Sequence, residues 1–159
     1  GVASKLGGAL RDRGFQNITV TDIPIEALAV AQRRLGPRAT GVMWRVEDIT
    51  TMELPADAYD LWHDRAVFHF LTSEADRRAY IQRVCCSVRR SGFVIVATFG
   101  PHGPEKCSGL SVVRYSADEL HDAFGDAFRL LEHREEHHQT PWGSEQEFVY
   151  CLCSKEQTC

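Results

Sequence analysis

The chain has 159 residues, 43% of them hydrophobic and 25% charged, an ordinary globular composition that predicts one domain with its own core. Its 18 basic and 22 acidic residues give a net charge of -4 without a basic cluster, so we expect no nucleic-acid partner. No apolar run approaches the roughly 20 residues of a membrane span, and no signal-peptide layout is present. We therefore expect a cytoplasmic protein without a membrane partner, with its six cysteines reduced.

The first predicted element is a helix over about residues 6–13, with Ser4 as its N-cap and Gly14 as the residue that ends it. A helix that leads into an interior parallel strand normally follows another strand, because parallel strands are joined by βαβ crossovers. We therefore expect the first strand of the sheet to be missing from this chain. Residues 1–4 would then be the tail of a glycine-rich loop.

A β-branched run over 18–21 predicts a short strand that ends on Asp22, and Pro24 opens a helix that continues to about Leu35. In doubly wound α/β folds, an acid at the tip of the second strand typically accepts the ribose hydroxyls of a nucleoside cofactor. The alternative is that Asp22 caps the helix by accepting its first unpaired N–H groups. The sequence leaves both interpretations open.

A second short strand, over 41–46, is also followed by an acid and an apolar residue, Asp48 and Ile49. This repeats the pattern at Asp22, and two acids at successive strand tips are less common than one. A loop over 50–57 then leads to a strand over 59–63.

The densest polar group of the chain begins at the end of that strand and consists of His63, Asp64, Arg65 and His69. As catalytic residues, His63 or His69 would be a base, Arg65 a clamp for an anionic substrate, and Asp64 the residue that orients either. The structural alternative is that Asp64 and Arg65 form an ion pair that fixes a turn, while His69 packs locally. A strand tip in an α/β fold favours function for Asp64 and Arg65.

The rest of the chain continues the alternation and then changes character. The sequence predicts a helix over 72–89, a buried strand over 93–99, a long loop that is a candidate lid, a helix from Ser116 to about Phe124, and a hairpin of strands over 128–138 and 146–153. This order specifies an α/β fold with a mostly parallel, helix-covered sheet. We assign 1–153 to one domain and 154–159 to a polar tail.

In this order, the acid-tipped strands, the buried strand and the closing hairpin resemble the seven-stranded class I S-adenosylmethionine-dependent methyltransferases. The most specific part is the combination of the sequences DLWHDRAVFHFL, GPEKCSGL and RYS, and the resemblance extends from Gly1 to about Cys153. It implies a Rossmann-like sheet flanked by helices, a C-terminal antiparallel hairpin, and S-adenosyl-L-methionine as the cofactor.

The resemblance also assigns roles to residues that bind the cofactor. The loop that receives the methionine half is matched at its end by Gly1, Ala3 and Ser4. The ribose-binding acid is matched by Asp22, with the adjoining Ile23, and the residues at the adenine are matched by Asp48 and Ile49. The segment that flanks the methyl group contains His63.

We therefore expect methyl transfer to a small polar or anionic acceptor, with a protein acceptor as the alternative. Two other functions stay open. Asp22 also suits the ribose of a dinucleotide, as in an NAD(P)-dependent reductase of Rossmann type. A missing strand also fits a non-catalytic, methyltransferase-like module that acts by interaction.

Zinc-type ligands occur near the end of the chain, but their spacing matches no closed structural site; they are Glu132, His133, His137, His138, Cys151 and Cys153. We therefore predict no metal site. Cys107, in the long loop, is a reactive thiol near the substrate or, as lone loop cysteines usually are, a small apolar filler.

Overall fold

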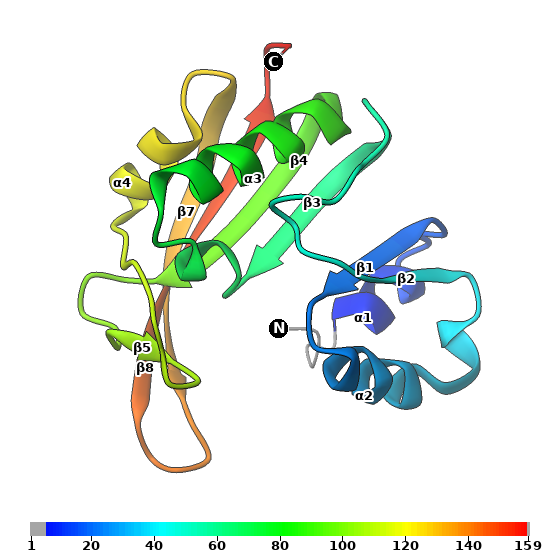
Figure 1. Cartoon of the computed structure of the whole chain (residues 1–159), viewed down its shortest axis with the longest axis horizontal. Coiled ribbons are helices and arrows are strands. Elements are labelled where there is room, and N and C mark those ends of the chain that lie inside the picture. Colours follow the sequence, from blue (N-terminus) through cyan, green and yellow to red (C-terminus); the bar gives the residue numbers. More distant parts are fainter. Residues whose placement is uncertain (1–5, 159) are drawn as a thin grey trace. The chain divides into compact units, whose positions relative to one another are not determined.

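The computed structural model describes residues 6–158, and the chain divides after Met52 into two compact units (Figure 1). The assignment of residues 1–153 to one domain stays a prediction. Among the described residues, no strand pairing joins the two units, because each has a sheet of its own. None of the helices in this part of the chain has the length and apolar character that a membrane crossing needs.

The first unit is built from two helices, a short 3-10 helix and two strands. In chain order these are α1 (Leu6–Asp12), β1 (Ile18–Asp22), α2 (Ile25–Leu35), η1 (Gly36–Ala39) and β2 (Val42–Val46). β1 and β2 pair in parallel, with Ile18 opposite Val42 and Asp22 opposite Val46. The helices and strands predicted for this stretch are confirmed.

The end of α1 shows why the sequence predicts it well. Gly14 has a φ of 89°, a left-handed conformation that glycine adopts without strain. Its N–H donates to the carbonyl of Arg11 at 3.0 Å, and the N–H of Phe15 donates to the carbonyl of Leu10 at 3.1 Å. This pair of bonds is a Schellman motif, so Gly14 ends the helix as predicted. The predicted N-cap, Ser4, lies outside the described residues.

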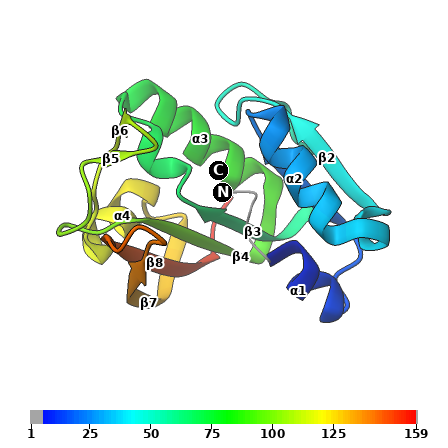
Figure 2. The same ribbon diagram turned by 90° about the horizontal axis from the view of Figure 1, so that it is seen from below.

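The second unit contains a four-stranded sheet with the spatial order β3 (Tyr59–Arg65), β4 (Val88–Phe99), β8 (Glu145–Lys155) and β7 (Phe128–Gln139). β3 and β4 are parallel, and β8 is antiparallel to both of its neighbours. The helix α3 (Glu74–Ser87) connects the parallel pair and lies over one face of the sheet, with α4 (Ala117–Phe124) beside it (Figures 1 and 2). The predicted α/β fold with a closing hairpin is confirmed.

Alternate residues of this sheet point to its two faces. Asp64 accepts a hydrogen bond from Tyr80 of α3, and the thiol of Cys151 donates to the carbonyl of Ala117 in α4 at 3.6 Å. The face that carries Asp64 and Cys151 is therefore the helix-covered face. The next row across the sheet lies on the opposite face and consists of Arg65, Ala97 and Tyr150.

The start of β4 corrects the predicted helix over 72–89, which ends at Ser87. Val88, with an exposed fraction of zero, already pairs with Tyr59 of β3. A bulge follows, in which Ser91 has a φ of 63° and Gly92 allows close packing, since a Cβ there would lie 2.7 Å from Cγ1 of Val88. The Ser91–Gly92 pair therefore lies within β4 and bends the strand.

The long loop between β4 and α4 is anchored rather than open. It contains the short hairpin of β5 (Lys106–Cys107) and β6 (Leu110–Ser111). The carboxylate of Glu147, buried on β8, accepts the N–H of His102 at 3.1 Å, and the backbone carbonyl of Glu147 accepts the N–H of Gly100 at 3.0 Å. A Cβ at Gly100 would lie 2.1 Å from the Glu147 carboxylate, so any side chain there would displace that carboxylate.

The C-terminal end of β8 corrects two further predictions. The strand continues to Lys155, so the first two residues of the predicted polar tail belong to the sheet. Lys155 is buried, and its ammonium group donates to the carbonyls of Cys85 and Val88, at the C-terminal end of α3. Cys85 is disulfide-bonded, which corrects the expectation that every cysteine is reduced.

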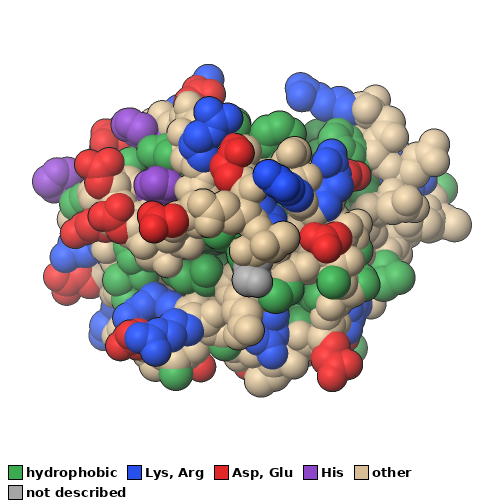
Figure 3. Space-filling view, turned by 90° about the horizontal axis from the view of Figure 1, so that it is seen from above, with side chains coloured by type: hydrophobic (Ala, Val, Ile, Leu, Met, Phe, Trp, Pro, Cys, Tyr) green, Lys and Arg blue, Asp and Glu red, His purple; other side chains and the backbone are tan. Residues whose placement is uncertain are grey.

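Basic and acidic side chains are interspersed on the face of the molecule seen in Figure 3.

β1 and β3 each pair with one strand only among the described residues. The additional strand expected before residue 1 stays a prediction.

We predict that Lys155→Met lowers the free energy of unfolding by about 2 kcal/mol, because it leaves buried carbonyls without their donor while keeping the length of the side chain. Urea denaturation followed by circular dichroism measures this. Lys106→Met, at an exposed position, is the matched control and should change the value by less than about 0.5 kcal/mol. Equal stability of the two variants would contradict the capping role of Lys155.

Candidate active site

Two carboxylates lie at the same edge of the first unit. Asp22 is the last residue of β1 and stands opposite Val46, the last residue of β2. Asp48 follows two residues later. Because the two strands are parallel, their carboxyl ends meet at one edge, where α/β folds hold their ligands.

The structure excludes one of the two interpretations of Asp22. The N-cap of α2 is Pro24, and the helix has no side-chain capping bond. Asp22 accepts instead the N–H of its neighbour Ile23, at 2.9 Å. The helix-cap interpretation is therefore wrong, and Asp22 lies at the strand tip as a ribose-binding acid would.

Asp48 shapes the loop that follows β2. Its carboxylate accepts both the N–H and the hydroxyl of Thr50, at 2.8 and 2.7 Å, and its backbone carbonyl accepts the N–H of Met52 at 2.8 Å. Ile49 is buried, whereas Ile23 is 62% exposed. The other residues expected at the cofactor, Gly1, Ala3 and Ser4, lie outside the described residues.

In the second unit, Asp64 is an anchor beneath the end of β3. It is 5% exposed and faces α3. Its two oxygens accept the N–H groups of Val67 and Phe68, both at 2.9 Å, and the hydroxyl of Tyr80 at 2.6 Å. Trp62 donates in turn to the Tyr80 oxygen at 3.0 Å. Asp64 thus fixes the turn after β3, as the structural alternative held, but through backbone amides and a tyrosine.

Burial raises the pKa of the Asp64 carboxyl, and its hydrogen bonds partly offset the rise. Burial, followed by the charge of Asp64, raises the pKa of Tyr80, so the tyrosine keeps the proton that it donates. The turn that this pair supports contains Ala66 at a φ of 66°, with its N–H bonded to the carbonyl of Ala97 at 2.9 Å. A left-handed alanine needs such support, because the conformation is strained for any residue with a Cβ.

Arg65 points to the opposite face from Asp64. Its Nε donates to the hydroxyl of Tyr150 at 2.8 Å, and its guanidinium carbon lies 4.0 Å from the centre of the Phe148 ring. A cation at this distance over an aromatic face is attracted by the ring. The Arg65 side chain is half-buried, and Arg65 is the last residue of β3, at the carboxyl end of a parallel strand.

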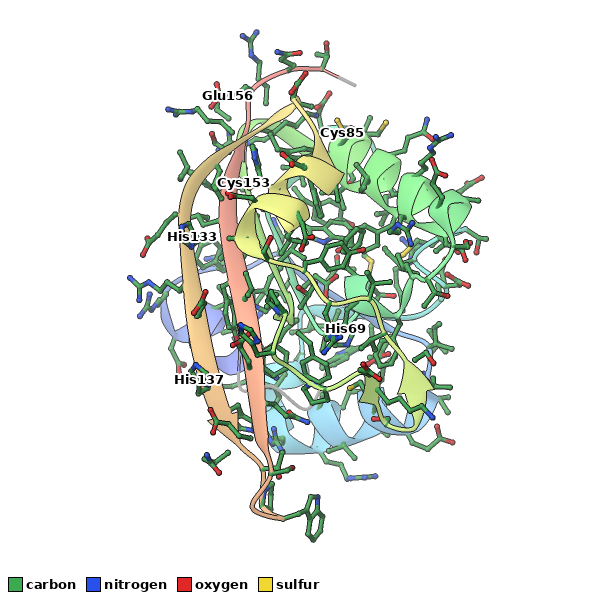
Figure 4. The ribbon with its side chains drawn as sticks, turned by 90° about the vertical axis from the view of Figure 1, so that its left-hand side faces the viewer. His69, Cys85, His133, His137, Cys153 and Glu156 are labelled. Carbon is green, nitrogen blue, oxygen red and sulfur yellow. The ribbon has the colours of Figure 1, made fainter. Side chains whose placement is uncertain are left out.

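The two histidines expected as bases differ in position. His63 is half-buried on the same sheet face as Arg65, and burial is the largest cause that lowers its pKa. His69 has an exposed fraction of zero, and its Nδ1 accepts the N–H of Phe99 at 3.2 Å (Figure 4). Burial lowers the pKa of His69 to about 4, so both rings favour the neutral form. The position of His69 matches the local-packing alternative.

The histidines of the closing hairpin lie along β7, where Figure 4 shows His133 and His137. His137 pairs with Glu145, and His133 stands opposite Cys151. Burial raises the pKa of the Cys151 thiol to about 12, which disfavours the thiolate that a zinc site uses. Within residues 6–158, no three potential ligands gather as a metal site.

Sequence reasoning did not find Tyr80, Phe148 or Tyr150. Phe148 and Tyr150 alternate on one face of β8, a visible period of two. The sequence does not show which strand lies beside β8, so it does not connect Phe148 and Tyr150 with Arg65.

A family model described as a methyltransferase domain matches residues 4–96, which is more than half of the chain. The chain belongs to this methyltransferase-domain family. The resemblance to class I S-adenosylmethionine-dependent methyltransferases is thereby confirmed, with S-adenosyl-L-methionine as cofactor. The family decides in favour of a methyltransferase over the reductase and the non-catalytic module.

Solved structures support the same fold. A methyltransferase from Methanosarcina mazei is 16% identical, with a TM-score of 0.75 over 97% of this chain and 88% of its own. The N-methyltransferase NodS from Bradyrhizobium japonicum WM9, in complex with S-adenosylhomocysteine, is 14% identical, with a TM-score of 0.71 over 95% of this chain and 74% of its own.

A third structure is the 1,6-didemethyltoxoflavin-N1-methyltransferase of Burkholderia thailandensis, with 1,6-didemethyltoxoflavin and S-adenosylhomocysteine bound. It is 16% identical, with a TM-score of 0.69 over 98% of this chain and 68% of its own. Identities this low show a shared fold. No curated protein matches the chain.

We predict that His69 makes this methyltransferase domain acid-sensitive. Its folded pKa of about 4 lies below the unfolded value of 6.5, so the stabilisation is complete above pH 6.5 and is lost as the pH falls toward 4. The loss specific to His69 should reach about 3 kcal/mol between pH 7 and pH 4.

Urea denaturation of the wild type and His69→Gln across this pH range measures the difference. His138→Gln, at an exposed position, is the control. A wild type and a His69→Gln variant that lose stability in parallel would contradict the prediction.

Proposed function

We propose that this domain transfers the methyl group of S-adenosylmethionine to a small acceptor that carries an anionic group, and that Arg65 binds this group. The observation that carries the proposal is the fixed guanidinium at the carboxyl end of β3, held by Tyr150 and Phe148. Guanidinium groups recognise carboxylates and phosphates through paired hydrogen bonds. The Burkholderia fold neighbour, with 1,6-didemethyltoxoflavin bound, supports a small-molecule acceptor.

The strand-tip acids of the first unit fit the nucleoside part of the cofactor. Asp22 is not used as a helix cap, and a carboxylate at a strand tip accepts two neighbouring ribose hydroxyls. Asp48 would receive the adenine amino group, on a loop that its own bonds to Thr50 hold in shape. Bound there, the cofactor supplies an electrophilic methyl group, and the protein supplies alignment.

His63 is the residue that we propose as the base. It lies on the same face of β3 as Arg65, two residues away, which is about 7 Å along a strand. Its lowered pKa keeps the ring neutral at pH 7, so it can accept a proton from an acceptor O–H or N–H as the new bond to carbon forms. Asp64 supports the turn beside it and takes no proton.

The test compares Arg65→Ala with the wild type in the transfer of radiolabelled methyl groups from S-adenosylmethionine to a panel of small hydroxy- and amino-carboxylic acids and to the matching amides. We expect wild-type turnover of at least one acid over its amide, and a loss of about 100-fold in Arg65→Ala, equal to about 2.7 kcal/mol. Binding of S-adenosylhomocysteine should be unchanged.

Arg90→Ala is the matched control, because it removes an exposed arginine near the start of β4, whereas Arg65 stands opposite Ala97 near the end of that strand. If Arg65→Ala still methylates the acid at the wild-type rate, the role of Arg65 in binding the anionic group is contradicted. A preference for the amides would contradict the anionic acceptor.

A further inference from the structure

The place of Arg65 depends on a row of residues that crosses three strands. Arg65 of β3 stands opposite Ala97 of β4, and Ala97 stands opposite Tyr150 of β8. Residues that stand opposite each other in a sheet share a face. The arginine therefore reaches over the middle strand to bond with the third.

The small side chain of Ala97 makes this reach possible. Adjacent strands are about 4.8 Å apart, so Tyr150 begins about 10 Å from Arg65. The bond from Nε to the tyrosine oxygen is nevertheless 2.8 Å long, and Ala97 has an exposed fraction of zero between the two residues. A larger side chain at position 97 would occupy the space that the arginine crosses.

The other side of the guanidinium is fixed as well. Phe148 lies two residues before Tyr150 on the same face of β8, and its ring is 4.0 Å from the guanidinium carbon. Phe148 is 2% exposed and packs edge-on against Phe99, with 4.9 Å between the ring centres. These two rings and Ala97 form a buried cluster, so the surface under Arg65 is rigid.

We propose that Tyr150 is a positioning residue that holds the guanidinium of Arg65 in the orientation that binds the acceptor anion, with Ala97 as the residue whose size permits it. This inference rests on the proposed function of Arg65. An arginine side chain has many rotamers, and a bond at Nε together with a ring beneath the plane selects one of them. The anion then meets an ordered fork, and less ordering accompanies binding.

The first test is spectroscopic and needs no acceptor. In a 15N–1H spectrum of the full chain, the Nε–H signal of Arg65, assigned by its loss in Arg65→Lys, should exchange slowly with water. Tyr150→Phe should speed this exchange at least about 10-fold, because it removes the acceptor of the bond. Tyr59→Phe, at the far end of β3, is the matched control and should leave the signal unchanged.

The second test uses the best carboxylic acid from the panel above. Tyr150→Phe should raise its KM about 10-fold with kcat within a factor of about two, and Ala97→Val should do the same. The KM for S-adenosylmethionine should not change. A purely structural role would instead lower kcat and the affinity for both substrates together.

Three outcomes separate the two proposals. Slow exchange of the Arg65 signal in Tyr150→Phe would overturn the positioning role, whatever the acceptor. Fast exchange with an unchanged KM for the acid in Tyr150→Phe would also overturn it. If Arg65→Ala keeps its activity toward the acid while the exchange result holds, the function proposed for Arg65 fails although its contact with Tyr150 stands.

Discussion

The buried carboxylate of Asp64 is the constraint on which the candidate site in the second unit depends. An ionised group inside a protein is costly unless donors surround it, and Asp64 has two backbone N–H groups and the hydroxyl of Tyr80. Those bonds hold the turn after β3, including the left-handed Ala66. Because a strand sends successive side chains to opposite faces, fixing Asp64 toward α3 also fixes Arg65 toward the other face.

Each unit places polar side chains at the carboxyl ends of parallel strands. Asp22 and Asp48 do so in the first unit, and Arg65 does so in the second. The chemistry divides in the same way, since carboxylates accept from the hydroxyls and amine of a nucleoside while a guanidinium donates to an anion. Under the proposed function, the carboxylates bind the cofactor and the guanidinium binds the acceptor, because methyl transfer from a sulfonium needs mainly alignment and a site poor in water.

Features with a local cause were predictable from the sequence. Gly14 ends α1, and Ser116 opens α4 with a complete capping box that involves Glu119. The errors came where a distant strand overrides a local cue. Val88 extends β4 toward Tyr59 in place of continuing a helix, and Lys155 continues β8 because its ammonium group has buried carbonyls to bind.

The candidate site was predictable in its residue types and less so in their roles. The acids at the strand tips and the polar group at the end of β3 were found from the residue pattern alone. The separate tasks of Asp64 and Arg65 were not, because they follow from the register of β3, β4 and β8. The contact of Arg65 with Tyr150 joins residues 85 positions apart, and no pattern within either segment encodes it.

The central claim is that this chain binds the nucleoside of S-adenosylmethionine through Asp22, and isothermal titration with S-adenosylhomocysteine tests it most directly. We predict micromolar binding, about -8 kcal/mol, that Asp22→Asn weakens at least about 10-fold. The control is Asp12→Asn, because Asp12 lies in the same unit and forms an ion pair with Arg38. This variant should bind S-adenosylhomocysteine like the wild type. Equal affinity of Asp22→Asn and the wild type, or no binding by a folded wild type, would contradict the claim.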